Sequence, residues 1–243
     1  MKMARIWSVG TILLVIVAAS AYETFGQAAT LTVVASSDEG TAPMQFVIPL
    51  DGEKVVTQNI SKTELTDPDT GSLIGTLEDL TVTFNTDPVV QFGFAFKAGA
   101  SDTTFSLSSG TLNFAPLVNP TAAATGTLTL VSNDGGSATG QFPGDKAFEA
   151  SYNGGTVFAQ LVDPLSLPGF GATTANETSP IPQGTFATIS GSVSSMEGNF
   201  DVLVTANELI TGTGQFQVIP EPASLALMAL GVLAVVKRRR ASH

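Results

Sequence analysis

Apolar and polar residues alternate with a period of two through most of this chain, and few folds accept that pattern. Between residues 29 and 219, short runs rich in Thr, Val and Phe are separated by Gly, Asn, Asp and Pro. The clearest run is 90–96, in which Val90, Phe92, Phe94 and Phe96 would share one face of a strand. Residues 80–84 repeat the pattern and are predicted to pair with 90–96 as a hairpin. No stretch of this region shows the 3.6-residue period of a helix, so an all-β fold is expected.

A single antiparallel β-sandwich is the predicted architecture for residues 29–217. The region contains many short alternating runs with turn residues between them, which is typical of two packed sheets and indicates a jelly-roll-like fold. Its length is sufficient for one hydrophobic core. Hairpin turns are predicted at 51–52, 133–136 and 153–155, where Asn, Asp and Gly tolerate positive φ. The proline-rich stretch 163–183 is expected to be a long surface loop.

Residues 1–28 have the three-part pattern of a secretory signal peptide. Lys2 and Arg5 precede an apolar run over 9–19, and small residues follow it. Cleavage is expected before Tyr22 or before Ala29, and the second position is preferred. An uncleaved signal anchor is the alternative, although the apolar run is short for a permanent span. The N-terminal signal helix is therefore not expected to belong to the fold.

The C-terminal segment 218–243 combines three unlike elements. Pro220 and Pro222 lack a backbone donor, so a helix can begin only after them, and Glu221 lies where negative charge favours a helix start. Residues 223–236 carry no charge and are predicted to form a transmembrane helix of about 21 Å, which is short for a bilayer core of about 30 Å. The membrane stop that follows, expected on the cytoplasmic side, consists of Lys237, Arg238, Arg239 and Arg240.

This order of parts resembles the PEP-CTERM sorting signal of Gram-negative and related bacteria. The matching sorting residues are Pro220, Glu221, Pro222, Ala223 and Ser224, followed by the apolar helix and the basic cluster. The resemblance implies recognition and cleavage by an integral-membrane exosortase, in bacteria that make extracellular polysaccharide and often biofilm or floc. The resemblance thus implies that the protein is exported and which protease processes it, and it implies no activity for the exported domain.

Charge and residue inventory exclude several functions for residues 29–219. This region holds nineteen acidic and four basic residues, so it would repel the phosphate backbone of a nucleic acid. The only His of the chain is His243, and no Arg lies in the region, so His-dependent triads, His-ligated zinc and bidentate Arg clamps are not available. The chain has no Cys, and the fold must be stable without disulfides.

Three carboxylates are candidate calcium ligands. Asp67, Asp69 and Glu78 have the spacing of positions 1, 3 and 12 in a calcium loop, where carboxylate oxygens surround a hard cation. Gly71 stands one position early and Glu78 falls in or near a strand, so a turn with solvated acids is the alternative. Residues 69–72 also spell the Asp-Thr-Gly-Ser of aspartic proteases, but no second copy completes the required dyad.

Side chains for catalysis and for aromatic sugar binding are sparse. Glycoside hydrolysis needs two carboxylates facing one bond, and the adjacent acids at 38–39 and 78–79 would point to opposite faces of a strand. The only Trp is Trp7, in the signal peptide, and Tyr152 is the only Tyr of region 29–219. Stacking on exposed rings is therefore not expected, and the Phe residues are assigned to the core.

The predicted function is that of a non-catalytic, exported protein of the cell surface or extracellular matrix. The expected partners are an exosortase-type membrane protease, the inner membrane through helix 223–236 before processing, and extracellular polysaccharide. No cofactor is expected apart from the calcium considered above. A calcium-dependent glycan-binding module is the first alternative, and a carboxylate-dependent hydrolase is the second.

Overall fold

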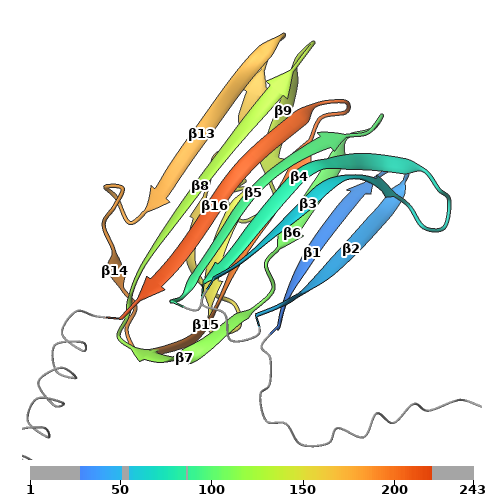
Figure 1. The fold of residues 1–243 in the computed structure, drawn as a ribbon. Helices are drawn as coiled ribbons and strands as arrows, with labels where there is room; N and C mark the ends of the chain where they lie inside the picture. The colour runs from blue at the N-terminus through green and yellow to red at the C-terminus, as the bar shows by residue number, and fades with distance from the viewer. Residues whose placement is uncertain (1–27, 51–54, 86, 221–243) are drawn as a thin grey trace, which may run out of the picture.

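The structure is a computed structural model that describes residues 28–50, 55–85 and 87–220. Within these ranges the chain is all-β, and its strands form two antiparallel sheets packed face to face (Figure 1). This confirms the predicted sandwich. The predicted signal helix and the predicted helix 223–236 lie outside the described residues.

The first sheet has nine strands. Its main order is β11-β10-β15-β6-β1-β2, with β7 and β9 also paired to β15 and with β12 paired to β9. The bounds are β1 (Ala28–Ser37), β2 (Gly40–Pro49), β6 (Thr103–Ser108), β7 (Leu112–Val118), β9 (Gly136–Gly140), β10 (Phe148–Tyr152), β11 (Thr156–Leu161), β12 (Leu165–Leu167) and β15 (Ser192–Val204).

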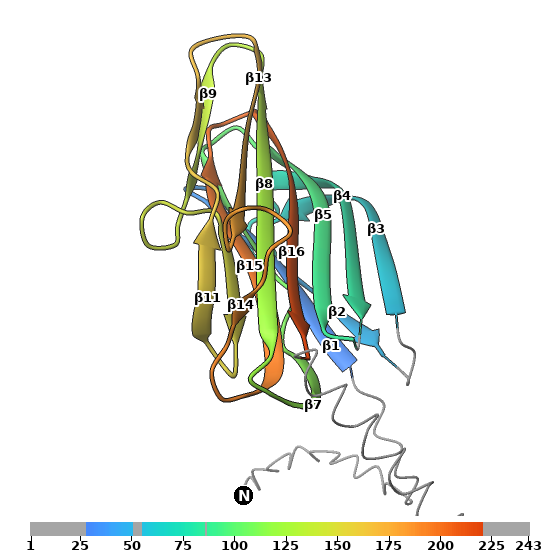
Figure 2. The same ribbon diagram turned by 90° about the vertical axis from the view of Figure 1, so that its left-hand side faces the viewer.

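The second sheet has seven strands in the order β13-β8-β16-β5-β4-β3, with β14 also paired to β8. Figure 1 shows this sheet nearest the viewer. Figure 2 shows β16 next to β15 of the first sheet. The bounds are β3 (Val55–Thr66), β4 (Leu73–Asn85), β5 (Val89–Ala98), β8 (Thr121–Ser132), β13 (Gly171–Ser179), β14 (Ala187–Thr188) and β16 (Leu209–Ile219).

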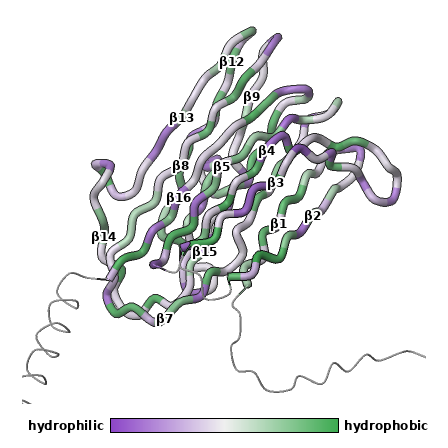
Figure 3. The backbone as a smooth tube through the Cα atoms, viewed as in Figure 1, coloured by the Kyte–Doolittle hydropathy of each residue, from purple (hydrophilic) through white to green (hydrophobic). Residues whose placement is uncertain are grey.

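The period-two pattern sorts residues between the core and the solvent. In β5, Val90, Phe92, Phe94 and Phe96 are buried, while the residues between them are at least partly exposed. Strand β4 pairs with β5 as the predicted hairpin, with Phe84 opposite Val90 and Leu80 opposite Phe94. Hydrophobic and hydrophilic stretches accordingly follow one another along the strands in Figure 3.

Phenylalanine rings from both sheets meet in the centre of the sandwich. Phe200 of β15 packs against Phe148 of the same sheet and Phe94 of the opposite sheet, with ring centroids 4.7 Å and 4.8 Å away. Glycines on the inward side of the second sheet make room for these rings. A Cβ atom on Gly214 would lie 2.6 Å from the Phe200 ring and 2.9 Å from the Phe148 ring. The inward glycines and the large rings are therefore complementary parts of one core.

The prediction of a surface loop over 163–183 was wrong. The segment contains β12 and β13, and β13 pairs with β8 over nine residues. Glu177 of β13 accepts hydrogen bonds of 2.8 and 3.0 Å from the Nζ atom of Lys146, which also contacts Asp163 at 2.6 Å. Burial alone would lower the pKa of Lys146, but the hydrogen bonds to Asp163 and Glu177 raise it above its ordinary value of 10.5. This ion-pair cluster ties β13 to the turn before β10.

The predicted hairpin turns have different outcomes. Residues 153–155 join the paired strands β10 and β11, with positive φ at all three positions, which confirms that hairpin. The prediction for 133–136 was wrong, because β8 and β9 belong to different sheets and this turn crosses between them. The turn at 51–52 lies outside the described residues.

Candidate binding face on the second sheet

The outer face of the second sheet carries three rows of mostly polar residues that cross six strands, from β3 through β4, β5, β16 and β8 to β13. The first row is Thr57, Thr83, Gln91, Gln215, Thr125 and Thr178. The second row is Asn59, Thr81, Gly93, Thr213, Thr127 and Asn176. The third row is Ser61, Asp79, Ala95, Thr211, Thr129 and Thr174. Asp79 is the one charged residue among these positions.

Threonine and glycine alternate on the adjacent strands β8 and β16 of this face. In 125–127 and 211–214 each Thr points outward and each Gly points inward toward the Phe rings. The glycines of this pattern therefore leave room for the core rings, and the threonines present hydroxyls to the solvent. Adjacent strands lie about 4.8 Å apart, and outward residues recur about every 6.8 Å along a strand, so the hydroxyls form a regular array.

Hydroxyl groups toward the edges of the array bond to one another. The Oγ1 atoms of Thr57 and Thr83 are 3.0 Å apart, and the Oγ1 atom of Thr81 donates to Asn59 at 2.8 Å. At the other edge, the Oγ1 atoms of Thr129 and Thr174 are 2.8 Å apart. Within the described ranges, the central hydroxyls of Thr127, Thr211 and Thr213 have no side-chain hydrogen-bond partner, so they can donate to and accept from a ligand.

Three shallow hollows follow one another along this face. The middle hollow, about 290 Å³, lies between Thr127, Thr211 and Thr213 on one side and Asp79 on the other, with Gly93 and Ala95 as its floor. A Cβ atom on Gly93 would meet no other atom within 4 Å, so the absent side chain leaves the hollow open. The lower hollow, about 180 Å³, includes Thr125 and Gln215, and the upper hollow, about 400 Å³, includes Ala95 and Leu209.

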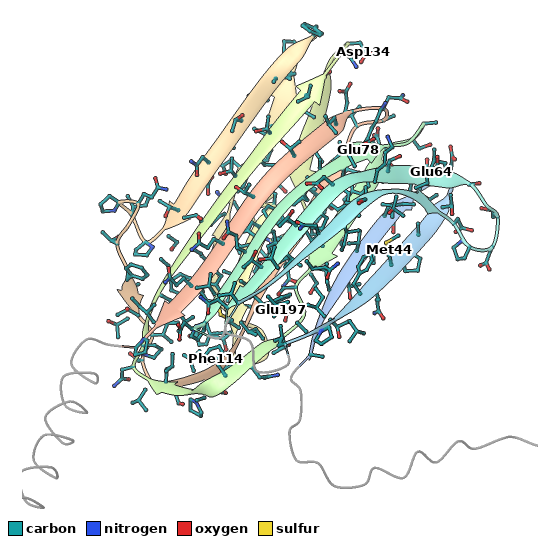
Figure 4. All side chains as sticks on the ribbon, in the orientation of Figure 1. Met44, Glu64, Glu78, Phe114, Asp134 and Glu197 are labelled. Atoms are coloured by element: carbon teal, nitrogen blue, oxygen red, sulfur yellow. The ribbon has the colours of Figure 1, made fainter. Side chains whose placement is uncertain are left out.

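We refer to these three hollows together as the groove. Consecutive outward residues of β8 and β16 line all three hollows. On β16 they run from Gln217 in the lower hollow to Leu209 in the upper one, which is about 27 Å along the strand. Phe186, whose exposed fraction is 40%, forms part of the wall at the lower end. Glu78, which is labelled in Figure 4, and Lys97 line the upper end. Glu78 forms an ion pair of 2.8 Å with Lys62.

The outer face of the first sheet is different in charge. Glu149 and Asp201 occupy outward positions there, together with Glu197, which is labelled in Figure 4. Each accepts a hydrogen bond from a neighbouring side chain, as in the 3.0 Å bond from Ser106 to Asp201. Burial raises the pKa of Asp201, and the bond from Ser106 only partly offsets this. The outer face of the first sheet thus carries acids alone among these residues, whereas the second sheet carries Asp79, the ion pair of Glu78 with Lys62, and Lys97.

The structure does not bring Asp67, Asp69 and Glu78 together as a calcium site. Asp67 is mostly buried, and its Oδ1 atom accepts the backbone N–H groups of Asp69 and Thr70 at 3.0 and 2.8 Å. Its Oδ2 atom accepts the N–H group of Thr41 at 2.9 Å, so donors occupy the positions that a cation would need. Glu78 lies in β4 and is held by Lys62. Among the residues that the structure describes, no group of three or more His, Cys, Asp or Glu could hold a metal ion.

Asp67 instead joins the two sheets. It lies in the turn between β3 and β4 of the second sheet, while Thr41 follows the turn between β1 and β2 of the first. Gly40, with φ of 137°, allows this contact, because a Cβ atom there would overlap the Asp67 carboxylate. The turn also contains the Asp-Thr-Gly-Ser sequence, which is therefore on an exposed connection and not in an apolar cradle.

Acid is expected to weaken this junction. The backbone N–H groups of Thr41 and Thr70 lower the pKa of Asp67 from 3.8 to about 2. Because the unfolded chain takes up a proton first, the stabilisation is complete above pH 3.8 and is lost as the pH falls through about 2. The variant Asp67→Asn should melt at a lower temperature than the wild type near neutral pH, and this difference in melting temperature should become smaller in acid. A difference that is the same at all pH values would contradict this. The control is the same substitution at the exposed Asp69, Asp69→Asn.

The prediction that the adjacent acids Glu78 and Asp79 point to opposite faces of a strand was wrong. The register between β4 and β5 shifts between Leu77 and Asp79, so a β-bulge at Glu78 places both Glu78 and Asp79 beside the groove. Both Glu78 oxygens lie within 2.9 Å of the Lys62 Nζ atom, so only Asp79 is available in the middle of the groove. The acids at 38–39 lie at the turn between β1 and β2.

Pro220 is the one predicted sorting residue that the structure describes. It follows β16 directly and borders an apolar hollow of about 340 Å³, whose lining includes Ile219, Leu117 and Phe114 (labelled in Figure 4). The positions of Glu221, Pro222, Ala223, Ser224 and the basic residues 237–240 lie outside the described ranges. Within those ranges no helix is long and apolar enough to cross a membrane.

The hydroxyl array was not predicted as a site. Its signal in the sequence is the Thr-x-Thr pattern at 81–83, 125–129 and 211–213. Each pattern alone indicates only the polar side of a strand, and the strand order that brings them together is not visible in the sequence. Tyr152 packs against the core, so it is not an exposed platform.

Comparison with known proteins identifies the C-terminal segment. Residues 218–240 match the family model described as the PEP-CTERM protein-sorting motif, which confirms the resemblance seen in the sequence. The motif marks an exported protein that is directed to the surface, with exosortase as its processing partner. The match covers only the tail and says nothing of the sandwich. No curated protein matches the chain.

Among solved structures, the likenesses are distant. A carbohydrate-binding module from Cellvibrio mixtus lichenase 5A, in complex with cellotriose, aligns with 67% of this chain and 95% of its own, at 13% identity and a TM-score of 0.25. A structure of infectious bursal disease virus, Gx strain, aligns with 82% of this chain and 54% of its own, at 10% identity and a TM-score of 0.30. At these TM-scores neither likeness supports a conclusion about this protein.

Proposed function

We propose that this protein is a non-catalytic component of the cell surface or extracellular matrix, released or attached after exosortase acts on its C-terminal motif. The observation that carries the proposal is the sorting motif at 218–240, which begins inside the last strand of the sandwich. Val218 is fully buried in β16, and the predicted membrane helix begins four residues after that strand ends. Before processing, the domain would therefore be held close to the membrane, and cleavage after the strand would free it without disturbing its core.

The residue inventory supports a role without catalysis. Residues 28–220 contain no His, Arg or Cys. A carboxylate mechanism would need two acids facing one bond, about 5–10 Å apart. The middle of the groove offers Asp79 alone, while Glu78 is neutralised by Lys62. A structural or adhesive function is the simpler use of such a face.

The tail should control processing without affecting the fold. The full chain would be expressed in a host that has exosortase, and the termini of the protein from medium and membranes would be determined by mass spectrometry. The wild type should lack the signal peptide and the basic end. Replacing Glu221 by Gln, or Arg238, Arg239 and Arg240 together by Gln, should leave uncut protein in the membrane fraction with an unchanged melting temperature, because these residues lie beyond the last strand.

Glu197→Gln, on the outer face of the first sheet, is the matched control and should be processed normally. Intact, untrimmed protein in the cytosol of wild-type cells would overturn the proposal. Unfolding of the domain by the Arg238–240 substitutions would do so as well.

A further inference from the structure

We propose that the groove on the outer face of the second sheet binds a single chain of an uncharged polysaccharide, aligned along β16. This inference rests on the proposed function, because it names what the exported domain would hold in the matrix. The three hollows of the groove follow β16 one after another for about 27 Å, a row that suits a linear polymer better than a compact ligand.

The lining has the hydrogen-bonding character of a sugar chain. Thr127, Thr211 and Thr213 present hydroxyls that have no side-chain partner among the described residues, and Gln215 and Gln217 add amide donors and acceptors. A hydroxyl can donate one hydrogen bond and accept two, so it can adapt to either role of a sugar hydroxyl. Phe186 adds an exposed ring at the lower end, where the apolar face of a sugar can stack.

Charge favours a neutral polymer. The domain carries a large excess of acids, so polyanions are repelled, and the middle of the groove contains Asp79 and no basic residue. Lys97 reaches only the upper hollow. A neutral glycan avoids this repulsion, and it can donate hydroxyl hydrogen bonds to Asp79.

The backbone disfavours an extended peptide. A bound peptide usually adds to the edge of a sheet, where backbone N–H and C=O groups are free. The strands beneath the groove are central, and β16 is paired with β8 on one side and β5 on the other. Only side chains are therefore available to a ligand here.

The test is electrophoresis of the full-length chain, in mild detergent, through native gels that contain a dissolved polymer. The probes are hydroxyethylcellulose and a galactomannan as neutral polymers and alginate as an anionic one. The wild type should be retarded by at least one neutral polymer and not by alginate. EDTA should not change the retardation, because no described carboxylate group forms a metal site.

Two variants locate the binding site. Gly93→Gln fills the middle hollow, into which its side chain can extend without meeting protein, and should abolish the retardation. Thr127→Val with Thr213→Val keeps the branched shape and removes two hydroxyls, and should weaken binding about 10- to 30-fold, at about fivefold for each lost hydrogen bond. Thr32→Gln, at an outward position of the first sheet, is the matched control and should bind as the wild type does.

Each other outcome overturns this inference. No retardation by either neutral polymer would exclude it, as would binding to alginate alone, loss of binding in EDTA, or binding that Gly93→Gln leaves intact. None of these results would affect export and processing, which the tail variants test separately. Release of reducing ends from a neutral polymer would instead contradict the non-catalytic part of the proposed function.

Discussion

Replacing Phe200 by Ala should lower the free energy of unfolding by about 3–5 kcal/mol, the cost typical of removing a buried aromatic ring from a core. Phe200 is 2% exposed and contacts Phe92 and Phe94 of the second sheet as well as Phe148 of its own. The cavity would therefore open between the two sheets, where neighbouring rings cannot easily close it. Urea unfolding followed by circular dichroism would measure the change.

The matched control for Phe200 is Phe170→Ala. Phe170 is 84% exposed, so its removal should change the free energy of unfolding by less than about 0.5 kcal/mol. A loss for Phe200→Ala no greater than that for Phe170→Ala would show that the rings do not hold the sheets together.

Replacing Gly214 by Val should destabilise the protein by about 1–3 kcal/mol or more, because the new side chain would overpack the core. A Cβ atom on Gly214 already lies 2.6 Å from the ring of Phe200, and that ring is confined by its neighbours. The same substitution at Gly93, on the adjacent strand β5 and the opposite face, should be neutral or stabilise by up to about 1 kcal/mol, since glycine is unfavourable within a strand.

The comparison of these two glycines tests the assignment of faces directly. Both variants can be measured by thermal and urea unfolding under identical conditions. Destabilisation by Gly93→Val equal to that by Gly214→Val would mean that the outer face is covered, and the groove would then not exist as described.

The sequence was sufficient to predict the fold class and the strongest strands. The 80–84 and 90–96 hairpin could be read because large apolar residues alternate with polar ones, and that contrast exists only where one face is buried and the other is wet. Strand β13 was missed because it is an edge strand in which Thr, Ala and Asn are partly exposed on both faces. Its flanking prolines gave a stronger signal for a loop than its weak alternation gave for a strand.

Of the candidate sites, too, some could be predicted from the sequence and others could not. The sorting tail could be recognised from the sequence because its parts are contiguous, and the family match at 218–240 confirms it. The calcium interpretation of Asp67 relied on spacing alone, and spacing does not show that backbone N–H groups already saturate the carboxylate. The groove is assembled from strands that are distant in the sequence, so it became visible only once β4, β5, β16 and β8 were seen side by side.

The position of β16 has a mechanical consequence for a protein held by its C-terminal end. This strand leads directly into the sorting motif, and it is paired along its full length with β8 and from Leu209 to Gln217 with β5. Backbone bonds in an antiparallel ladder run perpendicular to the strand, so a pull along β16 shears them together and does not peel them one by one. Tension on such a tether would thus be shared by two rows of bonds in the interior of the sheet, and the domain could bear load at that end.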